Sequence, residues 1–332
     1  MVVLGSQITA RPRRRNKSAR AIAGVFLLGA LLQGCSALVP QTAALRDKWP
    51  AALPQEVELT GAPFFPQRDY QCGPAALATA LAYFEVRVTA DDLVEQVYIP
   101  ERKGSVEVEM LAAPRRYGMI PYALAPRFED LLREIAAGTP VVVLQNYGAG
   151  TLDRWHYATA VGYNARSGSL VLRSGESRRW WMPFALFERT WRDSGYWAMV
   201  VVPPDHIPAT ADRKRYLEAL VAFERAGNAK ASVIAYRHYL ARWPDELGAS
   251  IGLANAFYSL GELDYVESVL RRALARHPDS VPVINNLAQT LSDKGANKEA
   301  LEIIQRAPDT AGPYSDTVRE TRSLIEERLQ GR

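Results

Sequence analysis

A spacing of 34 residues recurs through the C-terminal part of the chain and constrains its fold more than any other feature. Gly227, Gly261 and Gly295 lie at this interval, and the segment 243–245 (Trp-Pro-Asp) returns as His-Pro-Asp at 277–279. Two more registers carry apolar or small residues: Leu220, Ala254 and Ala288, and Phe223, Phe257 and Leu291. A pair of helices joined at the glycine cannot cover its own apolar face, so neighbouring pairs must stack. The spacing therefore predicts an all-helical solenoid.

In its details this region resembles the tetratricopeptide repeat, which has the same period, a small residue between the helices, and proline after the second helix. About three units are expected, at residues 212–245, 246–279 and 280–312, followed by a polar capping helix at Thr317–Leu329. Pro308 shortens the second helix of the third unit. A generic helical bundle is the alternative, but four registers that hold over two intervals argue against coincidence.

The N-terminus has the order of a secretory signal. Six basic residues without an acidic one precede an apolar stretch, Ala21–Leu32, that is too short to span a bilayer. The following Gly34-Cys35 resembles a bacterial lipobox, which implies removal of residues 1–34 and acylation of Cys35 to give a membrane lipoprotein. Ser36 favours the outer membrane, facing the periplasm. An ordinary cleaved signal or a short N-terminal anchor is the alternative.

The net charge of +4 belongs to this signal. Without its six basic residues the chain has 34 Lys and Arg against 36 Asp and Glu, so the basic pI gives no reason to expect nucleic-acid binding. The chain also lacks a Gly-x-x-x-x-Gly-Lys-Ser/Thr motif, which excludes nucleotide binding of that type. No metal or other cofactor is expected.

Cys72 stands on a Gly-Pro step at the start of an apolar helical run and is the strongest candidate for a catalytic residue. Unpaired N–H groups and the positive end of the helix dipole favour thiolate, the nucleophilic form of cysteine. With Cys35 acylated, Cys72 has no partner for a disulfide, although the periplasm is oxidising. A small buried hydrophobe is the alternative. Gln67, five residues upstream, is placed to donate to an oxyanion.

The catalytic base is expected to be His156. Of the four histidines, His206 lies in the interdomain linker, and His238 and His277 lie in the repeats. His156 begins an apolar strand, so it is expected near a sheet edge, where it can face a helix N-terminus. A structural histidine packed against Trp155 is the alternative.

Between a tether at 35–60 and a proline-rich linker at 204–211, the pattern changes from helices to strands. Helices are expected at Pro74–Phe84, Ala90–Val97, Val106–Tyr117 and Arg127–Ala136, and strands at Pro140–Gln145, His156–Tyr163, Ser169–Arg173, Arg178–Met182 and Tyr196–Val202. With the cysteine at the head of the first helix, this order predicts an α+β, papain-like domain over residues 61–203.

The motif Gln-x4-Cys-Gly-Pro-Ala-Ala-Leu at 67–77 and the motif His-Tyr-Ala-Thr-Ala-Val-Gly-Tyr-Asn at 156–164 resemble one family. It comprises the bacteriocin-processing cysteine peptidases that cut after double-glycine leaders, with their stand-alone relatives. The resemblance implies Cys72 as nucleophile, His156 as general base and acid, and Gln67 as oxyanion donor. Gln71 competes for that last role, but as the neighbour of Cys72 it is expected to point away.

The chain departs from this family at the residue that orients the imidazole. The family has an aspartate after the strand that follows the histidine hairpin, whereas this chain has Ser174. A serine supplies no countercharge to an imidazolium, so weak or specialised activity is expected. Asn164 and Glu176 are possible substitutes that the sequence does not separate.

These residues predict a periplasmic, membrane-anchored cysteine peptidase acting on peptides or proteins, whose repeats recruit the substrate or a protein partner. Two alternatives remain. One is a papain-like amidase or transferase acting on cell-wall or peptide amides. The other is a non-catalytic lipoprotein scaffold, which the missing aspartate favours.

Overall fold

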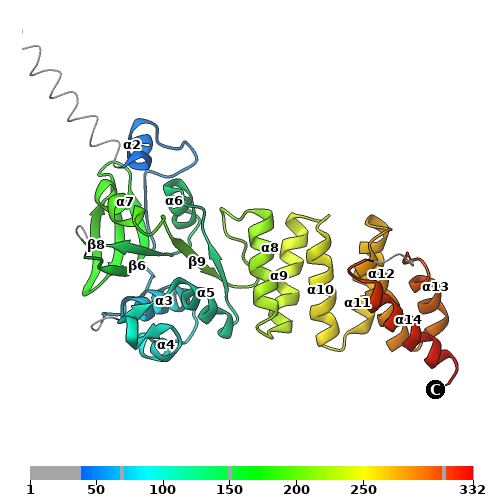
Figure 1. Ribbon diagram of the computed structural model, residues 1–332. Helices are drawn as coiled ribbons and strands as arrows, with labels where there is room; N and C mark the ends of the chain where they lie inside the picture. Colours follow the sequence, from blue (N-terminus) through cyan, green and yellow to red (C-terminus); the bar gives the residue numbers. More distant parts are fainter. Residues whose placement is uncertain (1–38, 68–70, 149–151, 309–311, 332) are drawn as a thin grey trace, which may run out of the picture.

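The computed structural model describes residues 39–67, 71–148, 152–308 and 312–331, in which an α+β domain is followed by a row of helices (Figure 1). The predicted fold class, an α+β domain followed by an all-helical region, is confirmed. The predicted signal peptide and Cys35 lie outside the described residues. Within the described residues, no helix is both long and apolar enough to cross a membrane.

The α+β domain is built on an antiparallel sheet of seven strands. The strands are β1 (Glu56–Glu58), β4 (Ile120–Ala123), β5 (Val141–Asn146), β6 (Trp155–Asn164), β7 (Ser169–Ser174), β8 (Ser177–Pro183) and β9 (Ala198–Val202). Their order is β4-β9-β5-β6-β7-β8, and β1 pairs with β6. The strands β5 to β9 agree with the sequence prediction to within two residues at each end. The short strands β1 and β4 were not predicted.

Helices cover both faces of this sheet. Both faces are apolar, as β5 shows, because its successive side chains point alternately into two cores. Val142 and Leu144 pack in the core beneath α3 (Cys72–Tyr83), α4 (Ala90–Val97) and α5 (Glu107–Arg116). Val141 and Val143 join the opposite core with α6 (Phe128–Ala136) and α7 (Phe184–Arg192). Figure 1 shows α3 to α5 on one side of the strands and α6 and α7 on the other.

The start of α3 is covered by a small hairpin of β2 (Tyr98–Ile99) and β3 (Gly104–Ser105), joined by a 3-10 turn η1 (Pro100–Arg102). A Cβ atom on Gly73 would lie 2.2 Å from Ser105 Oγ, so only glycine fits against the hairpin here. Helix α3 is apolar nearly all round, as predicted, and is buried from Gly73 to Leu81. The hairpin therefore closes one side of the space around the N-terminus of α3.

The segment expected to be a tether differs from that expectation. Its described part contains α2 (Pro40–Asp47) as well as β1. The buried Glu188 carboxylate accepts the N–H groups of Gln41 at 2.9 Å and Thr42 at 2.6 Å, which caps α2. Gln41 in turn caps α6, because its Oε1 accepts from Phe128 N at 2.6 Å. These caps, from α7 to α2 and from α2 to α6, fix α2 to the domain. The sequence did not indicate this helix, because its eight residues have no apolar periodicity.

The predicted linker is also fixed in place. The Glu134 side chain on α6 is fully buried and accepts hydrogen bonds from Ala209 N at 3.2 Å, Thr210 N at 2.7 Å and Thr210 Oγ1 at 2.6 Å. Tyr122 Oη accepts from Asp212 N at 2.9 Å where the helical region begins. The junction between the two regions is therefore a packed, hydrogen-bonded element.

The C-terminal region consists of α8 (Arg213–Glu224), α9 (Ala229–Arg242), α10 (Leu247–Ser259), α11 (Leu263–Arg276), α12 (Val281–Asp293), α13 (Asn297–Ile304) and α14 (Ser315–Leu329). Gly227, Gly261 and Gly295 occupy the turns inside successive helix pairs with positive φ angles of 89°, 75° and 83°, which glycine adopts without strain. Helix α13 has 8 residues where α9 and α11 have 14, as Pro308 predicted.

Candidate active site

Cys72 is the first residue of α3, with Gln71 at the N-cap. Its thiol is partly buried and receives backbone hydrogen bonds from Tyr157, Gly73 and Cys72 itself, which lower its pKa. Burial has the larger effect, so the pKa of the thiol lies above its ordinary value. The shift is opposite in sign to the one expected from the helix N-terminus alone. In the free protein, Cys72 is therefore a protonated thiol at neutral pH.

His156 lies near the start of β6, one residue before Tyr157. Its Nε2 is 2.8 Å from Ser174 Oγ at the end of β7. Burial, together with the positive charge of Arg154, lowers the pKa of His156 to about 4. The imidazole is therefore neutral at physiological pH and able to accept a proton.

Ser174 connects His156 to a chain of neutral hydrogen-bonding groups. The Ser174 hydroxyl hydrogen bonds to the Tyr147 phenol, whose pKa burial raises to about 12. Tyr147 Oη donates to Gln145 Oε1 at 3.0 Å, and Gln145 Nε2 donates to Thr190 Oγ1 at 2.7 Å. Thr190 Oγ1 lies 3.0 Å from the carbonyl oxygen of Phe187 in α7. The chain of hydrogen bonds thus runs from the imidazole to α7, which lies on the face of the sheet opposite α3.

The hydrogen bonds along this chain all have matching donors and acceptors when the neutral His156 carries its proton on Nε2. Nε2–H donates to Ser174, the Ser174 hydroxyl donates to Tyr147, and the Tyr147 hydroxyl donates to Gln145. Because a neutral imidazole has one N–H, Nδ1 is then the acceptor. The Tyr147 ring also stacks on the imidazole, with ring centroids 5.1 Å apart and an angle of 30° between the planes. Uncharged groups therefore hold His156 in the Nε2–H tautomer. In Ser-His-Asp triads, an aspartate fixes the tautomer of the histidine.

Gln67 is held close to both candidate residues. Its Nε2 donates to the carbonyl oxygen of Tyr157 at 3.4 Å, and its backbone N–H donates to Gly175 O at 3.2 Å. Tyr157 is the residue that contacts Cys72 through its backbone and follows His156 in β6. The side-chain amide of Gln67 therefore contacts the same residue of β6 as the Cys72 thiol does.

The structure does not bring all the predicted groups into contact. Among the hydrogen bonds of the described residues there is none between Cys72 and His156. Asn164 lies at the opposite end of β6, where it accepts from Ser167 N, and Glu176 is exposed in the turn between β7 and β8. Ser174, rather than either alternative, is the side chain that hydrogen bonds to His156.

Sequence reasoning missed Tyr147 and Gln145. Both belong to a polar segment at the C-terminal end of β5: Gln145 is in the strand, and Tyr147 directly follows it. That segment gave a signal, but nothing in the sequence indicates that Tyr147 reaches Ser174, which is 27 residues further along the chain.

Comparison with known proteins finds similarity to one family over the α+β domain. Residues 59–199 match the family described as Peptidase_C39 like, and the match contains Gln67, Cys72, His156 and Ser174. The chain thus combines a C39-like peptidase domain, built on an antiparallel sheet, with a C-terminal all-helical region. No curated protein matches the chain.

Several solved structures are similar to part of the chain. A putative C39-like peptidase from Bacillus anthracis has 18% identity and a TM-score of 0.38, over 45% of this chain and 98% of that one. A double glycine motif protease from an AMS/PCAT transporter, in complex with its leader peptide, has 22% identity and a TM-score of 0.34, over 42% and 91%. The peptidase domain of Streptococcus ComA, a bifunctional ABC transporter, has 18% identity and a TM-score of 0.35, over 43% and 98%.

Proposed function

We propose that the protein is a cysteine peptidase in which Cys72 is the nucleophile and His156 the general base and acid. The observation that carries this proposal is the hydrogen bond from His156 to Ser174, which leaves Nδ1 as an acceptor one residue from the backbone contact of Cys72. The thiol and the imidazole are both neutral at physiological pH. The reaction therefore starts from a neutral pair instead of a preformed thiolate–imidazolium pair.

In the first half of the reaction, the Cys72 sulfur attacks the carbonyl carbon of the scissile amide while its proton passes to His156 Nδ1. The carbonyl π electrons become an oxyanion, which receives hydrogen bonds from Gln67 Nε2 and the N–H groups at the start of α3. Collapse expels the amine, which takes the proton from His156, and leaves a thioester. Water then attacks the thioester with the same imidazole as base and releases the acid product.

The peptidase proposal is tested by comparing cleavage of a peptide library by the purified protein and by three variants. Mass spectrometry identifies the products. Cys72→Ala is expected to abolish cleavage, and Ser174→Ala to reduce it by about tenfold through loss of one hydrogen bond to the base. Ser177→Ala, a change at the exposed partner of Ser174 on β8, serves as the matched control. Equal cleavage by all four proteins, or by none, would falsify the peptidase proposal.

A non-catalytic scaffold is the second candidate, favoured by the raised pKa of Cys72 and by the missing hydrogen bond between Cys72 and His156. Thiol labelling at neutral pH does not separate the two, because a protonated thiol is slow to react in both. Trapping a thioester with a peptide substrate distinguishes the enzyme from the scaffold. Hydroxylamine release of that acyl group from the wild type, and not from Cys72→Ala, supports the enzyme and excludes the scaffold.

The proposed location is a lipid anchor at Cys35 in the outer membrane, facing the periplasm. It is supported by the order of basic, apolar and small residues before Cys35. Metabolic labelling with a radioactive fatty acid is expected to mark the wild type but not Cys35→Ala. Label in both proteins would contradict acylation at this residue.

The helical region is proposed to consist of tetratricopeptide repeats that recruit the substrate or a protein partner. The support is the 34-residue spacing of the turn glycines together with the packing of α8 to α13 as consecutive pairs. Recruitment is tested by comparing cleavage of a long protein substrate with that of a short peptide, because only the long substrate gains from a second binding site.

A further inference from the structure

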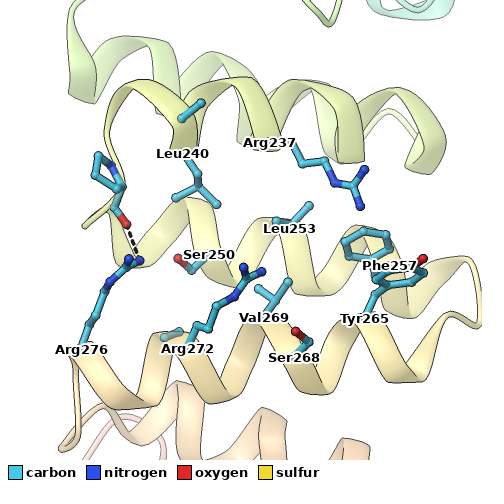
Figure 2. Close-up of a pocket in the computed structure, with 13 residues that line it drawn as sticks. Arg237, Leu240, Ser250, Leu253, Phe257, Tyr265, Ser268, Val269, Arg272 and Arg276 are labelled. Atoms are coloured by element: carbon cyan, nitrogen blue, oxygen red, sulfur yellow. Dashed lines mark hydrogen bonds between the residues drawn. The ribbon is translucent and has the colours of Figure 1, made fainter.

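A groove of about 420 Å³ lies in the helical region, between α9 and α11, with α10 as its floor (Figure 2). The floor is apolar: Leu253 and Phe257 of α10 and Val269 of α11 are buried there. Tyr265 of α11 stacks on Phe257, with ring centroids 5.0 Å apart, but keeps 53% of its own surface exposed. The groove therefore presents an apolar and aromatic strip that is open from one side.

Arginines stand along both walls of this groove. Arg237 on α9 lies over the Phe257 ring, 5.3 Å from its centroid, and Arg272 projects from the middle of α11, as Figure 2 shows. Among the described residues, no carboxylate lies within ion-pair distance of Arg237 or Arg272. Arg276, at the end of the groove, donates to Pro244 O at 2.9 Å and is 3.7 Å from Asp245.

Charged side chains close to the groove form ion pairs, unlike Arg237 and Arg272. Arg271, adjacent to Arg272, is 2.7 Å from Glu267, and Lys294 is 2.6 Å from Asp264. From residue 212 to 332 the chain has 17 basic and 17 acidic side chains, so the region as a whole is electrically balanced. The groove is therefore positively charged, although the helical region as a whole has no net charge.

We propose that this groove binds an acidic peptide segment that carries an aromatic or leucine side chain. The apolar side chain would lie on the strip of Leu253, Phe257 and Val269, and the flanking carboxylates would pair with Arg237 and Arg272. The proposal rests on the recruiting role given above to the helical region, and it adds the place and the chemistry of the ligand. It does not depend on the chemistry of Cys72.

A peptide fits these observations better than a nucleic acid. A nucleic-acid site needs a continuous positive surface, because affinity comes from many phosphate contacts. This groove instead sets isolated guanidinium groups above a buried apolar floor in a region without net charge. That combination resembles a protein interface, in which an apolar centre is enclosed by a polar rim.

The test measures binding of fluorescent eight-residue peptides to the full chain carrying Cys72→Ala, so that cleavage cannot interfere. One peptide set contains Asp or Glu around Phe and Leu, a second replaces the acids with Lys, and a third replaces Phe and Leu with Ser. The first set is expected to bind about tenfold or more tightly than the others, and to weaken as salt rises. An oligothymidylate is the nucleic-acid probe.

The location is tested with Arg237→Glu/Arg272→Glu, which is expected to lower affinity for the first peptide set about tenfold or more. The matched control, Lys214→Glu/Lys298→Glu, makes the same change in net charge at exposed positions outside the groove and is expected to bind as the parent does. Equal loss in both variants, a preference for the Lys peptides, or tighter binding of oligothymidylate would overturn the proposal. Because no cleavage is measured, such a result leaves the peptidase proposal standing.

Discussion

The candidate active site of the α+β domain and the helical region differ in their use of charge. Around His156, the α+β domain uses an imidazole, a serine, a tyrosine and a glutamine, all neutral at physiological pH. The helical region keeps its charges at the surface, in ion pairs such as Arg328 with Asp293 at 2.8 Å and in the unpaired arginines of the groove. Buried neutral groups respond to pH and little to salt, whereas exposed charges respond to salt.

This difference implies that the proposed catalysis and the proposed recruitment can be separated by solution conditions as well as by mutation. A change of pH below about 5 should act on the site through the pKa of His156, which is about 4. A change of ionic strength should act on the groove. The following variants and conditions test the contrast between the neutral site and the charged groove.

The largest effect is expected for His156→Gln, which removes the base but retains a hydrogen-bonding side chain. Cleavage should fall about 10²- to 10⁴-fold, the range that general acid–base catalysis contributes. Peptide binding in the groove should stay unchanged. His206→Gln, in the linker beside Phe84, is the control and should retain activity. Cleavage that survives His156→Gln would remove this residue from the mechanism.

The junction should open when Glu134 is replaced by Ala, because the N–H groups of Ala209 and Thr210 then lose their buried acceptor. Loss of these bonds should cost about 2 kcal/mol of local opening free energy, or about 30-fold in the population of the open junction. Limited proteolysis near residue 210 measures this population. Glu129→Ala, an exposed carboxylate on the same helix, should leave the cleavage rate unchanged.

A carboxylate at position 174 should turn the neutral site into a charged one. In Cys72→Ala/Ser174→Asp, the negative charge beside the imidazole favours its protonated form, so the pKa of His156 should rise by about 1–3 units. Cys72→Ala alone should keep it near the value of about 4. Titration by NMR gives both numbers, and Ser174→Asn is the uncharged control. A parent value at or above 6.5 would contradict the neutral site.

A smaller effect is expected for Tyr147→Phe, which breaks the chain of hydrogen bonds between Ser174 and Gln145. Loss of one bond should lower kcat about three- to tenfold. Nitrogen NMR of His156 should show a smaller share of the Nε2–H tautomer, which a purely structural role would not change. Tyr163→Phe, in the same sheet, removes a buried hydroxyl without a hydrogen-bond partner and should alter neither measurement.

The smallest effect on cleavage is expected from salt. Between 50 and 500 mM salt, cleavage of a short uncharged peptide should change less than about twofold, because the groups at the site are buried and neutral. Binding of the acidic peptides should weaken about tenfold or more over the same range. A similar salt response of both measurements would remove the contrast between the two regions.

The sequence determined the helical region more completely than the sheet, for a physical reason. Gly227, Gly261 and Gly295 set turns by local backbone preference, and each helix packs on its neighbour in the chain. The strands β1 and β4 have only 3 and 4 residues, and they are stabilised by pairing with β6 and β9, which lie far away in the sequence. Pairing of that kind leaves no local pattern.

At the candidate site, the sequence predicted which residue types are present but not how they are connected. The motifs around Cys72 and His156 predicted that these residues lie close together, and the Cys72 thiol contacts the backbone of Tyr157, the residue after His156. The sign of the Cys72 pKa shift could not be predicted, because burial depends on the hairpin and sheet that enclose the helix start. The link from Ser174 through Tyr147 joins separate strands, so it appears only in the folded chain.

If Cys35 carries the proposed lipid, the caps that fix α2 between α7 and α6 limit how far the domain can move from a membrane. Because α2 begins at Pro40 and is fixed by Glu188, about five residues separate a lipid at Cys35 from the fixed part of the domain. Even fully extended, such a length spans at most about 18 Å. A lipid-anchored enzyme of this design would search a thin layer at the membrane surface, and substrates in the open periplasm would have to come to it.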